Sequence, residues 1–283
     1  MPLPIAPAIT NSPIASSDVD QRVWTPPSGL VMPGTDLRLR VLSYNIQVGL
    51  QTGHYGHYVT RAWRHALPAP GMHRNLDRIA ELLRDYDFVA IQEADAGSLR
   101  TQFTNQVEYL ARKAGFAHWG LSVTRDLRPV ARHALAFLSR YAPAQVDEHV
   151  LPSTLPGRRA MRIVLGADAG GLQLLVAHLS LSRGAQHAQL DYLNRLVPAQ
   201  GPVLLLGDLN CDAAALRLHA QASGGRLRVA DETPLTFPSW QPRRSLDHIL
   251  HTPELTLHRL HALPHPISDH LPLAAEVGLL LPP

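Results

Sequence analysis

The sequence predicts an α/β protein in which two β-sheets pack against each other and helices cover their outer faces. Strand-like and helix-like runs alternate in the first part of the chain, and strand-like runs follow one another closely later on. The 283 residues are 45% hydrophobic and only 17% charged, a composition that suits a globular chain with a large buried core.

The first part of the chain alternates between predicted strands and helices. Residues 37–46 (LRLRVLSYNI) lead into an apolar strand, and residues 75–85 carry apolar side chains at helical spacing. Residues 87–91 (DFVAI) predict a short buried strand that runs directly into Glu93. A helix over residues 102–114 follows.

The second part is richer in strands. Four consecutive apolar residues at 203–206 (VLLL) predict a strand that is buried on both faces. The turn at 166–171 joins two of the predicted strands as a hairpin. The predicted strands are 134–138, 158–165, 172–181, 202–206, 245–250, 255–263 and a last run within 267–277, and the predicted helices are 186–196 and 213–218.

Two stretches match neither pattern. Residues 1–36 are rich in Pro and predict an extended or partly disordered arm, with a docking segment as the alternative. Residues 49–73 are rich in Gly, His and aromatic residues and predict a long loop, with a short helix around 59–65. The four His residues of this loop lack the spacing of a closed zinc site, so substrate contact or simple surface exposure is the favoured interpretation.

Charge, cysteine content and hydropathy exclude several classes of protein. The formal net charge is +3, which suits an anionic substrate but falls short of the dense basic stripe of a dedicated nucleic-acid binder. The single cysteine excludes an intramolecular disulfide. The sequence has no apolar run long enough to span a membrane and no ordinary secretory signal, so the cytoplasm is the expected location.

Polar residues stand where several buried strands end. Asp208 follows the strand at 203–206, and Asn210 lies two residues further on, on the same side of an extended chain. Such strand ends are where α/β sheets carry their chemistry. A turn with Asp208 as a helix N-cap explains the same residues equally well. Taken singly, Glu93 fits a solvated strand end and His178 a hydrogen-bonded core histidine.

Taken together, the polar motifs resemble the endonuclease/exonuclease/phosphatase (DNase I-like) superfamily, a bacterial-type member in particular. The resemblance covers residues 37–278 and implies a four-layer α/β sandwich in one catalytic domain, 37–283, that hydrolyses phosphoesters with a divalent metal. The motifs are, in order, Tyr44-Asn45-Ile46, Gln92-Glu93, His178-Leu179, Gly207-Asp208-Leu209-Asn210, Leu246-Asp247-His248 and Ser268-Asp269-His270.

The chemistry of phosphoester hydrolysis suggests roles for the acidic residues. Charge on the phosphoryl oxygens must be neutralised and water must become a nucleophile, and magnesium, or manganese in its place, is a hard ion held by a few oxygen ligands. We expect Glu93 to bind this ion, with Asn45 through its side-chain oxygen and with Asp269 as a third ligand, direct or through water. Asp208 is placed to accept the proton of the attacking water.

The remaining catalytic candidates are an amide and two histidines. Asn210 is expected to orient phosphate or water. His178 and His270, if protonated, would donate hydrogen bonds to the phosphoryl oxygens and the leaving group. The resemblance implies Asp247 as the residue that orients His270.

Three further residues have less certain assignments in the sequence. Arg158 or Arg159 is a candidate for phosphate contact, with a surface role as the equal alternative. His248 is expected to pack in the fold.

Departures from the family pattern narrow the substrate. Gln47, Cys211-Asp212-Ala213 and the turn at 236–240 (TFPSW) all differ from abasic-site repair enzymes, which argues against that activity. The expected function is therefore a magnesium-dependent phosphodiesterase acting on a small or lipid-headgroup phosphodiester. A sequence-tolerant nuclease is the alternative, so nucleic acid is a conceivable but not favoured partner, and a catalytically silent binding protein comes third.

Overall fold

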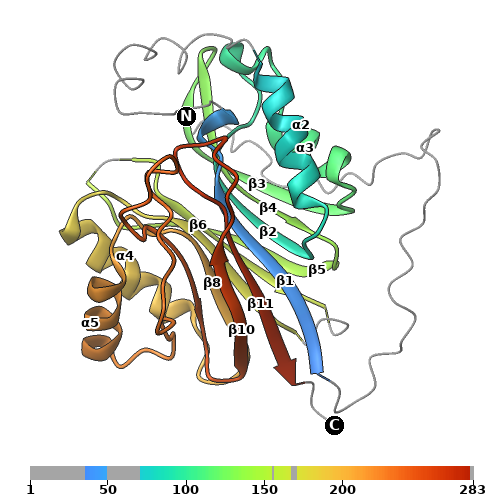
Figure 1. The fold of residues 1–283 in the computed structure, drawn as a ribbon. Coiled ribbons are helices and arrows are strands. Elements are labelled where there is room, and N and C mark those ends of the chain that lie inside the picture. The colour runs from blue at the N-terminus through green and yellow to red at the C-terminus, as the bar shows by residue number, and fades with distance from the viewer. Residues whose placement is uncertain (1–35, 50–70, 155, 167–170, 281–283) are drawn as a thin grey trace.

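The computed structural model describes residues 36–49, 71–154, 156–166 and 171–280, and these residues form two mixed β-sheets (Figure 1). The six-stranded sheet has the order β10-β11-β1-β2-β4-β3, and the five-stranded sheet has the order β5-β6-β7-β8-β9. In each sheet one neighbouring pair is parallel, β1 with β2 and β7 with β8, and the other pairs are antiparallel. The strands are β1 Asp36–Asn45, β2 Phe88–Asp95, β3 His118–Leu127, β4 Ala131–Ser139, β5 Pro143–Val150, β6 Arg159–Leu165, β7 Gln173–His178, β8 Val203–Asp208, β9 Asp247–His251, β10 Leu255–Ala262 and β11 Leu273–Leu280.

Four α-helices in the described part of the chain cover the outer faces of the sheets. The helices α2 (Met72–Leu83) and α3 (Gln106–Ala114) pack on the six-stranded sheet, and α4 (Arg183–Leu196) and α5 (Ala213–Ser223) pack on the five-stranded sheet (Figure 1). Two short 3₁₀ helices, Gln47–Gly49 and Leu99–Thr101, follow β1 and β2. The predicted four-layer α/β sandwich is confirmed.

The strands alternate between a face buried in the centre and a face buried under helices. In β8, Leu204 and Leu206 belong to the core between the sheets, whereas Val203 and Leu205 belong to the core beneath α4 and α5. Burying each such side chain contributes roughly 1.5–3 kcal/mol to the free energy of folding, so the burial of β8 strongly stabilises the sheet. The alternation places Asp208, two residues after Leu206, on the central side of the sheet.

The pairing of β7 with β8 depends on a glycine. A side chain at Gly207 would place its Cβ atom 1.9 Å from the carbonyl oxygen of Ala177 in β7. Only a residue without Cβ therefore allows β7 and β8 to approach this closely. The pairing puts His178 opposite Asp208 at the ends of the two strands.

The elements differ from the sequence prediction mainly at the edges of the sheets. The strands β3 and β5 were not predicted, because neither has a clear apolar alternation and much of each is solvent-accessible. The α3 helix begins at Gln106 rather than at residue 102, because the side chain of Asn105 accepts hydrogen bonds from the backbone amides of Val107 and Glu108. The predicted arm (residues 1–35 of it), most of the loop at 49–73 and its short helix lie outside the described residues.

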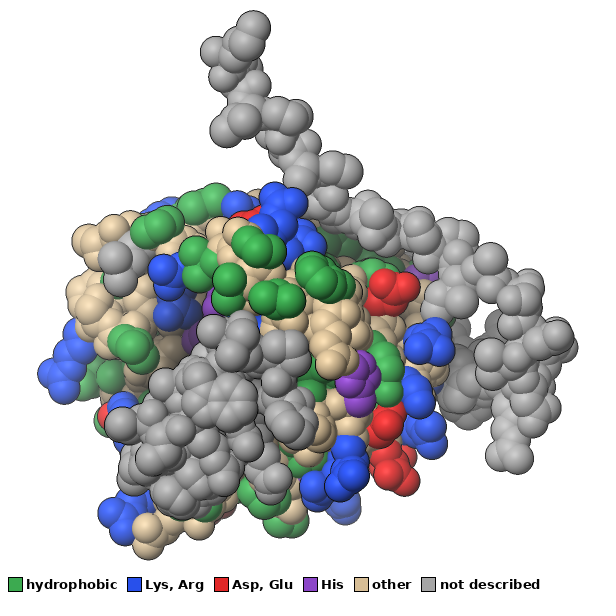
Figure 2. Space-filling view, turned by 90° about the horizontal axis from the view of Figure 1, so that it is seen from above, with side chains coloured by type: hydrophobic (Ala, Val, Ile, Leu, Met, Phe, Trp, Pro, Cys, Tyr) green, Lys and Arg blue, Asp and Glu red, His purple; other side chains and the backbone are tan. Residues whose placement is uncertain are grey.

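The helices and the surface charge both bear on function. Among the described residues, no helix has the length and apolar character needed to cross a membrane. In the view from above, the basic side chains of the described residues are scattered among hydrophobic and neutral ones and form no continuous stripe (Figure 2). The described side chains visible on this face therefore do not form the dense basic track that a dedicated nucleic-acid binder presents.

Candidate active site

Polar side chains from both sheets meet at one end of the central core. Asn45 ends β1 and Glu93 lies near the end of β2, both in the six-stranded sheet. In the other sheet, Asp208 pairs with His178 on one side and with Asp247 on the other. The sheet register alone thus sets three of these residues side by side.

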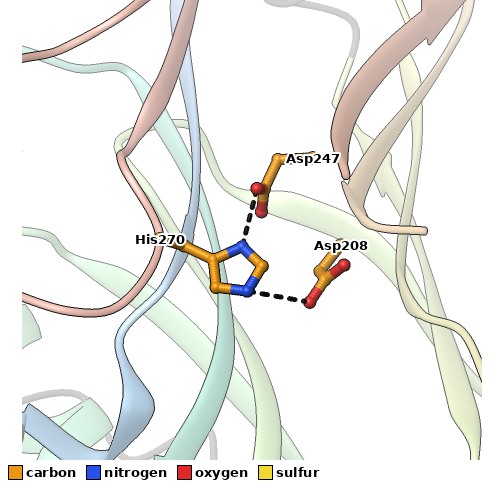
Figure 3. A group of neighbouring side chains, drawn as sticks. All are labelled: Asp208, Asp247 and His270. Atoms are coloured by element: carbon orange, nitrogen blue, oxygen red, sulfur yellow. Dashed lines mark hydrogen bonds and ion pairs between the residues drawn. The ribbon is translucent and has the colours of Figure 1, made fainter. Parts of the chain in front are cut away.

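His270 lies between two carboxylates, as Figure 3 shows. Its Nδ1 atom is 2.8 Å from Oδ2 of Asp247, and its Nε2 atom is 3.7 Å from Oδ2 of Asp208. All three side chains are buried, with His270 only 5% exposed. Asp247 therefore fixes one ring nitrogen and directs the other toward Asp208, which is how a carboxylate orients a catalytic imidazole.

The turn at residues 236–239 supports this pair from behind. The Thr236 hydroxyl accepts from the backbone amide of Asp247 at 3.4 Å, and Ser239 donates its hydroxyl to the carbonyl of Ser268 at 2.6 Å. The Phe237 ring lies against the His270 ring, with 5.0 Å between their centroids. In the sequence this turn only distinguishes the chain from abasic-site repair enzymes, and no local pattern reveals its supporting contacts.

The buried charges shift the pKa values of this group strongly. Burial opposes a charged imidazole, but the negative charges of Asp247 and Asp208 outweigh it and raise the pKa of His270 well above its usual value. Burial raises the pKa of Asp208 to about 7, helped by repulsion from Asp247 and Glu93 and opposed by His270 and Asn45. A carboxylate with a pKa near neutrality is well matched to accepting a proton at physiological pH.

A β-bulge turns Glu93 toward the other polar residues. Val89 and Ile91 face the helices α2 and α3, and strict alternation would send Glu93 the same way. The pairing of β2 with β4 instead shifts register between Ile91 and Ala94, and Glu93 has a φ of +56°. Glu93 consequently lies beside Asn45, whose amide nitrogen is 3.2 Å from its carboxylate.

The amide of Asn45 connects the two sheets. Its Nδ2 atom donates to Oε1 of Glu93 at 3.2 Å and to Oδ2 of Asp208 at 3.1 Å. Its Oδ1 atom accepts from the backbone amide of Gln47 at 3.1 Å. The expected metal contact through the Asn45 oxygen would therefore require the amide to turn over and release the Gln47 bond.

His178 and Asn210 approach the group from β7 and from the turn after β8. The Nε2 atom of His178 is 3.5 Å from Asp208 and 3.9 Å from Glu93. Burial, followed by the positive charge of Arg158, lowers the pKa of His178 well below its usual value, so a neutral N–H donor rather than an imidazolium is expected here. Asn210 donates its side-chain amide to the carbonyl of Leu179 at 2.9 Å, which fixes it beside Asp208.

The donor set fits a divalent cation. Asp269 is 8% exposed, and its charge, after burial, raises the pKa of Glu93, a repulsion that a cation between them would relieve. The Oδ1 atom of Asp247 is buried and accepts no hydrogen bond from the described residues.

Asp208, Asp247 and His270 also bring ligand atoms within 4.8 Å of one another. Both nitrogens of His270 face carboxylates in this group, and a hard ion prefers oxygen ligands. The carboxylates of Glu93 and Asp269 are therefore a better place for magnesium than the group formed by Asp208, Asp247 and His270.

The structure gives Arg158, Arg159 and His248 three different environments. Arg158 is partly buried beside the polar group and donates to the carbonyl of His178 at 3.5 Å. Arg159 forms an ion pair at 3.1 Å with Glu148 of the neighbouring strand β5, and this pairing favours a structural role over phosphate contact. His248 is buried on the helix-facing side and lies 2.8 Å from the carbonyl of Cys211, consistent with the expected packing role.

The family model for the Endonuclease/Exonuclease/phosphatase family matches residues 42–270. The chain belongs to this family. Family membership supports phosphoester hydrolysis as the class of activity. A search of curated proteins finds no match.

Solved structures of this family share the fold. An endonuclease/exonuclease/phosphatase from Beutenbergia cavernae DSM 12333 matches with a TM-score of 0.66 and 19% identity over 86% of this chain and 72% of its own. A mannosyl-6-phosphatase from Bacteroides thetaiotaomicron VPI-5482 matches at 0.61 and 17% over 84% and 99%. Sphingomyelinase C from Streptomyces griseocarneus matches at 0.62 and 16% over 85% and 99%. At these identities the likeness establishes the fold, and the choice of substrate depends on the site itself.

Proposed function

We propose that this chain is a magnesium-dependent hydrolase that cleaves a small or lipid-headgroup phosphodiester. The observation that carries the proposal is His270, held between the buried carboxylates of Asp247 and Asp208. The amide of Asn45 links Asp208 to a further oxygen ligand, Glu93. An oriented imidazole beside a proton-accepting carboxylate and a cation site is what phosphoester hydrolysis requires.

The side chains divide the work among them. Asp208 accepts the proton of the attacking water, and Asn210 holds that water or a phosphoryl oxygen in place. His270, charged and oriented by Asp247, donates to a phosphoryl oxygen, and neutral His178 donates a second hydrogen bond. A divalent ion bound at Glu93, with Asn45 and Asp269, would supply charge neutralisation on the phosphate and lower the pKa of water.

The experiment is hydrolysis of a substrate panel with and without magnesium. The panel contains a chromogenic phosphodiester, a phosphomonoester, plasmid DNA, RNA and sphingomyelin. Asp208→Asn is expected to melt like the native protein and to lose roughly 10²–10⁴-fold in turnover, because it lacks the general base. Undiminished turnover in a folded Asp208→Asn variant would remove Asp208 from the mechanism.

The same panel separates the alternatives. A nuclease would cleave DNA or RNA, with an affinity that falls steeply with salt as phosphate contacts are lost. Silence on every substrate, together with a failure to bind magnesium, would favour the binding-protein hypothesis.

A further inference from the structure

A pocket opens beside the catalytic group and shares Glu93 and His178 with it. Its volume of about 460 Å³ lies within the range of about 300–1,000 Å³ that small-molecule sites occupy. The walls come from β3, β4, the segment between β5 and β6, and the turn after β7. We call it the side pocket, and its lining residues are Glu93, Thr124, Arg125, His133, Ala134, Leu135, Ser153, Thr154, Pro156, Gly157, Arg158, His178, Ser180, Leu181 and Ser182.

The side pocket is lined by hydroxyl groups and cations. Five of the lining side chains carry a hydroxyl. Thr124 and Ser180 already hydrogen-bond within the protein, the first to the carbonyl of His133 and the second to the side chain of Gln189. Ser182 stands at the N-terminus of α4, yet its hydroxyl makes no capping hydrogen bond, and Thr154 is exposed in the pocket wall. Hydroxyls at these two positions are available to a ligand.

The cationic side of the pocket centres on Arg158. Its neighbours along the sheet are paired, Arg159 with Glu148 and Arg162 with Asp147. Arg158 is partly buried and forms no ion pair within 4 Å with any described residue. The negative charges of Glu93 and Asp208 nevertheless attract it over a longer distance. A partly buried guanidinium without a carboxylate partner is a ready site for a phosphoryl group.

Backbone packing holds Arg158 in this position. A side chain at Gly157, which has a φ of +104°, would place its Cβ atom 2.6 Å from the carbonyl oxygen of Thr124 in β3. The segment that carries Arg158 therefore lies directly on β3, and only glycine permits that contact. The backbone next to Arg158 is therefore held against β3 at this point of the pocket wall.

The described lining residues are poorly suited to two kinds of substrate group. None of the described lining residues is Phe, Tyr or Trp, so these residues offer no aromatic cage to a quaternary ammonium such as choline. Nucleobases bind through stacking on aromatic side chains, and the described part of the lining offers none apart from two imidazoles. The arginines Arg125 and Arg158 would in addition repel a cationic headgroup.

We propose that the side pocket binds a neutral polyhydroxylated group, a sugar or a cyclitol, that is esterified to the phosphate under attack. The inference rests on the proposed function and names its substrate class. Thr154 and Ser182 hydrogen-bond the hydroxyls of this group, and Arg158 contacts the phosphate. In the reaction the water oxygen bonds to phosphorus and gives one proton to Asp208, the bond from phosphorus to the polyol oxygen breaks, and the polyol oxygen takes up a proton from solvent, to which Asp208 later returns its own.

The test is binding to the Asp208→Asn variant, where the ligand is not consumed. Glycerophosphoinositol and glycerophosphocholine are matched diesters that differ in the headgroup, and calorimetry in the presence of magnesium gives their Kd values. We expect glycerophosphoinositol to bind at least about tenfold more tightly, the equivalent of two or more hydrogen bonds. Equal affinity, or tighter binding of the choline diester, would overturn the inference.

Variants locate the binding site. Adding Thr154→Val or Ser182→Ala is expected to weaken glycerophosphoinositol binding by about three- to tenfold each, the value of one hydrogen bond. Thr256→Val, an exposed threonine of β10, is the matched control and should change nothing. Loss of affinity in the control but not in the pocket variants would overturn the assignment. Turnover of the chromogenic diester by the native protein tests the proposed function separately, because that substrate carries no polyol.

Discussion

At the scale of single residues, the site depends on how tightly one imidazole is held. Asp247 is fully buried and contacts His270 at 2.8 Å through one oxygen, while its other oxygen accepts no hydrogen bond from the described residues. A carboxylate in this position selects the tautomer and the orientation of the ring it contacts. Its removal should therefore impair catalysis more than folding.

We predict that Asp247→Asn lowers kcat by roughly 10–100-fold or more, because residues that orient a catalytic group typically have effects of this size. Steady-state hydrolysis of the chromogenic phosphodiester measures the change, and thermal melting checks the fold. Asp231→Asn, at an exposed position, is the control. A folded Asp247→Asn variant with native kcat would show that His270 needs no orienting carboxylate.

The only cysteine gives a second prediction at this scale. Burial raises the pKa of the Cys211 thiol to about 12, and the charges of Asp208 and Asp212 add to the shift. Since the thiolate is the reactive form, the native protein should react with iodoacetamide at pH 8 far more slowly than the urea-unfolded chain. Mass spectrometry of the labelled protein measures both rates. Equal rates would mean that Cys211 is accessible and ionisable in the native state.

At the scale of elements, the pairing of β7 with β8 sets the distance between His178 and Asp208. This pairing requires the close approach of Gly207 to the Ala177 carbonyl, where a Cβ atom would lie at 1.9 Å. We predict that Gly207→Ala lowers the free energy of unfolding by about 1–3 kcal/mol or more, because the strands must separate to admit the methyl group.

Urea denaturation of Gly207→Ala measures this loss. The matched control is Gly184→Ala in α4, where the added Cβ meets no atom within 4 Å. This control should be neutral or stabilising by up to about 1 kcal/mol, because alanine favours the helix over glycine. Similar stability of the two variants would show that β7 and β8 adjust without cost.

The elements also show how far the sequence could predict the site. Alternation along β1, β7 and β8 correctly directs Asn45, His178 and Asp208 to the central side, because period-two patterns follow from strand geometry. The same rule fails for Glu93, since a bulge is a tertiary feature of the β2–β4 pairing. Here the family motif, and not the periodicity, identified Glu93.

Edge strands and contacts between distant residues were the other features that the sequence did not predict. The strand β5 lies at the edge of its sheet and exposes polar side chains on both faces, so its residues carry little hydrophobic pattern. The choice between Arg158 and Arg159 was open in the sequence because it depends on Glu148, a residue of the neighbouring strand. The roles of the site residues remain predictions that the variants above test.

At the scale of the whole molecule, the candidate metal ligands and the proposed proton acceptor come from different sheets. Asn45 and Glu93 extend from the six-stranded sheet, and Asp208 extends from the five-stranded sheet. The carboxylates of Glu93 and Asp208 face one another across the interface between the sheets, with the neutral amide of Asn45 between them. A cation bound there should therefore stabilise the packing of one sheet on the other.

We predict that magnesium raises the melting temperature by several degrees, since a ligand at 100 times its Kd stabilises the native state by about 2.7 kcal/mol. Differential scanning calorimetry with and without magnesium measures the shift. Glu93→Gln should require more magnesium for the same shift and for activity, so that added metal partly restores its rate. An identical magnesium dependence in the variant and the native protein would exclude Glu93 as a ligand.

The contact of Gly157 with β3 has a consequence for how this protein could change over evolutionary time. Gly157 and Arg158 of the pocket wall lie against β3, whereas the groups assigned to bond cleavage come from β1, β2, β7, β8 and β9 and from the segments that follow β8 and precede β11. Substitutions at positions such as Thr154 could therefore retune which alcohol is released without disturbing the proton acceptor. Related chains could diverge in substrate preference by changing this wall alone, and a library restricted to it would be a compact starting point for redirecting the enzyme.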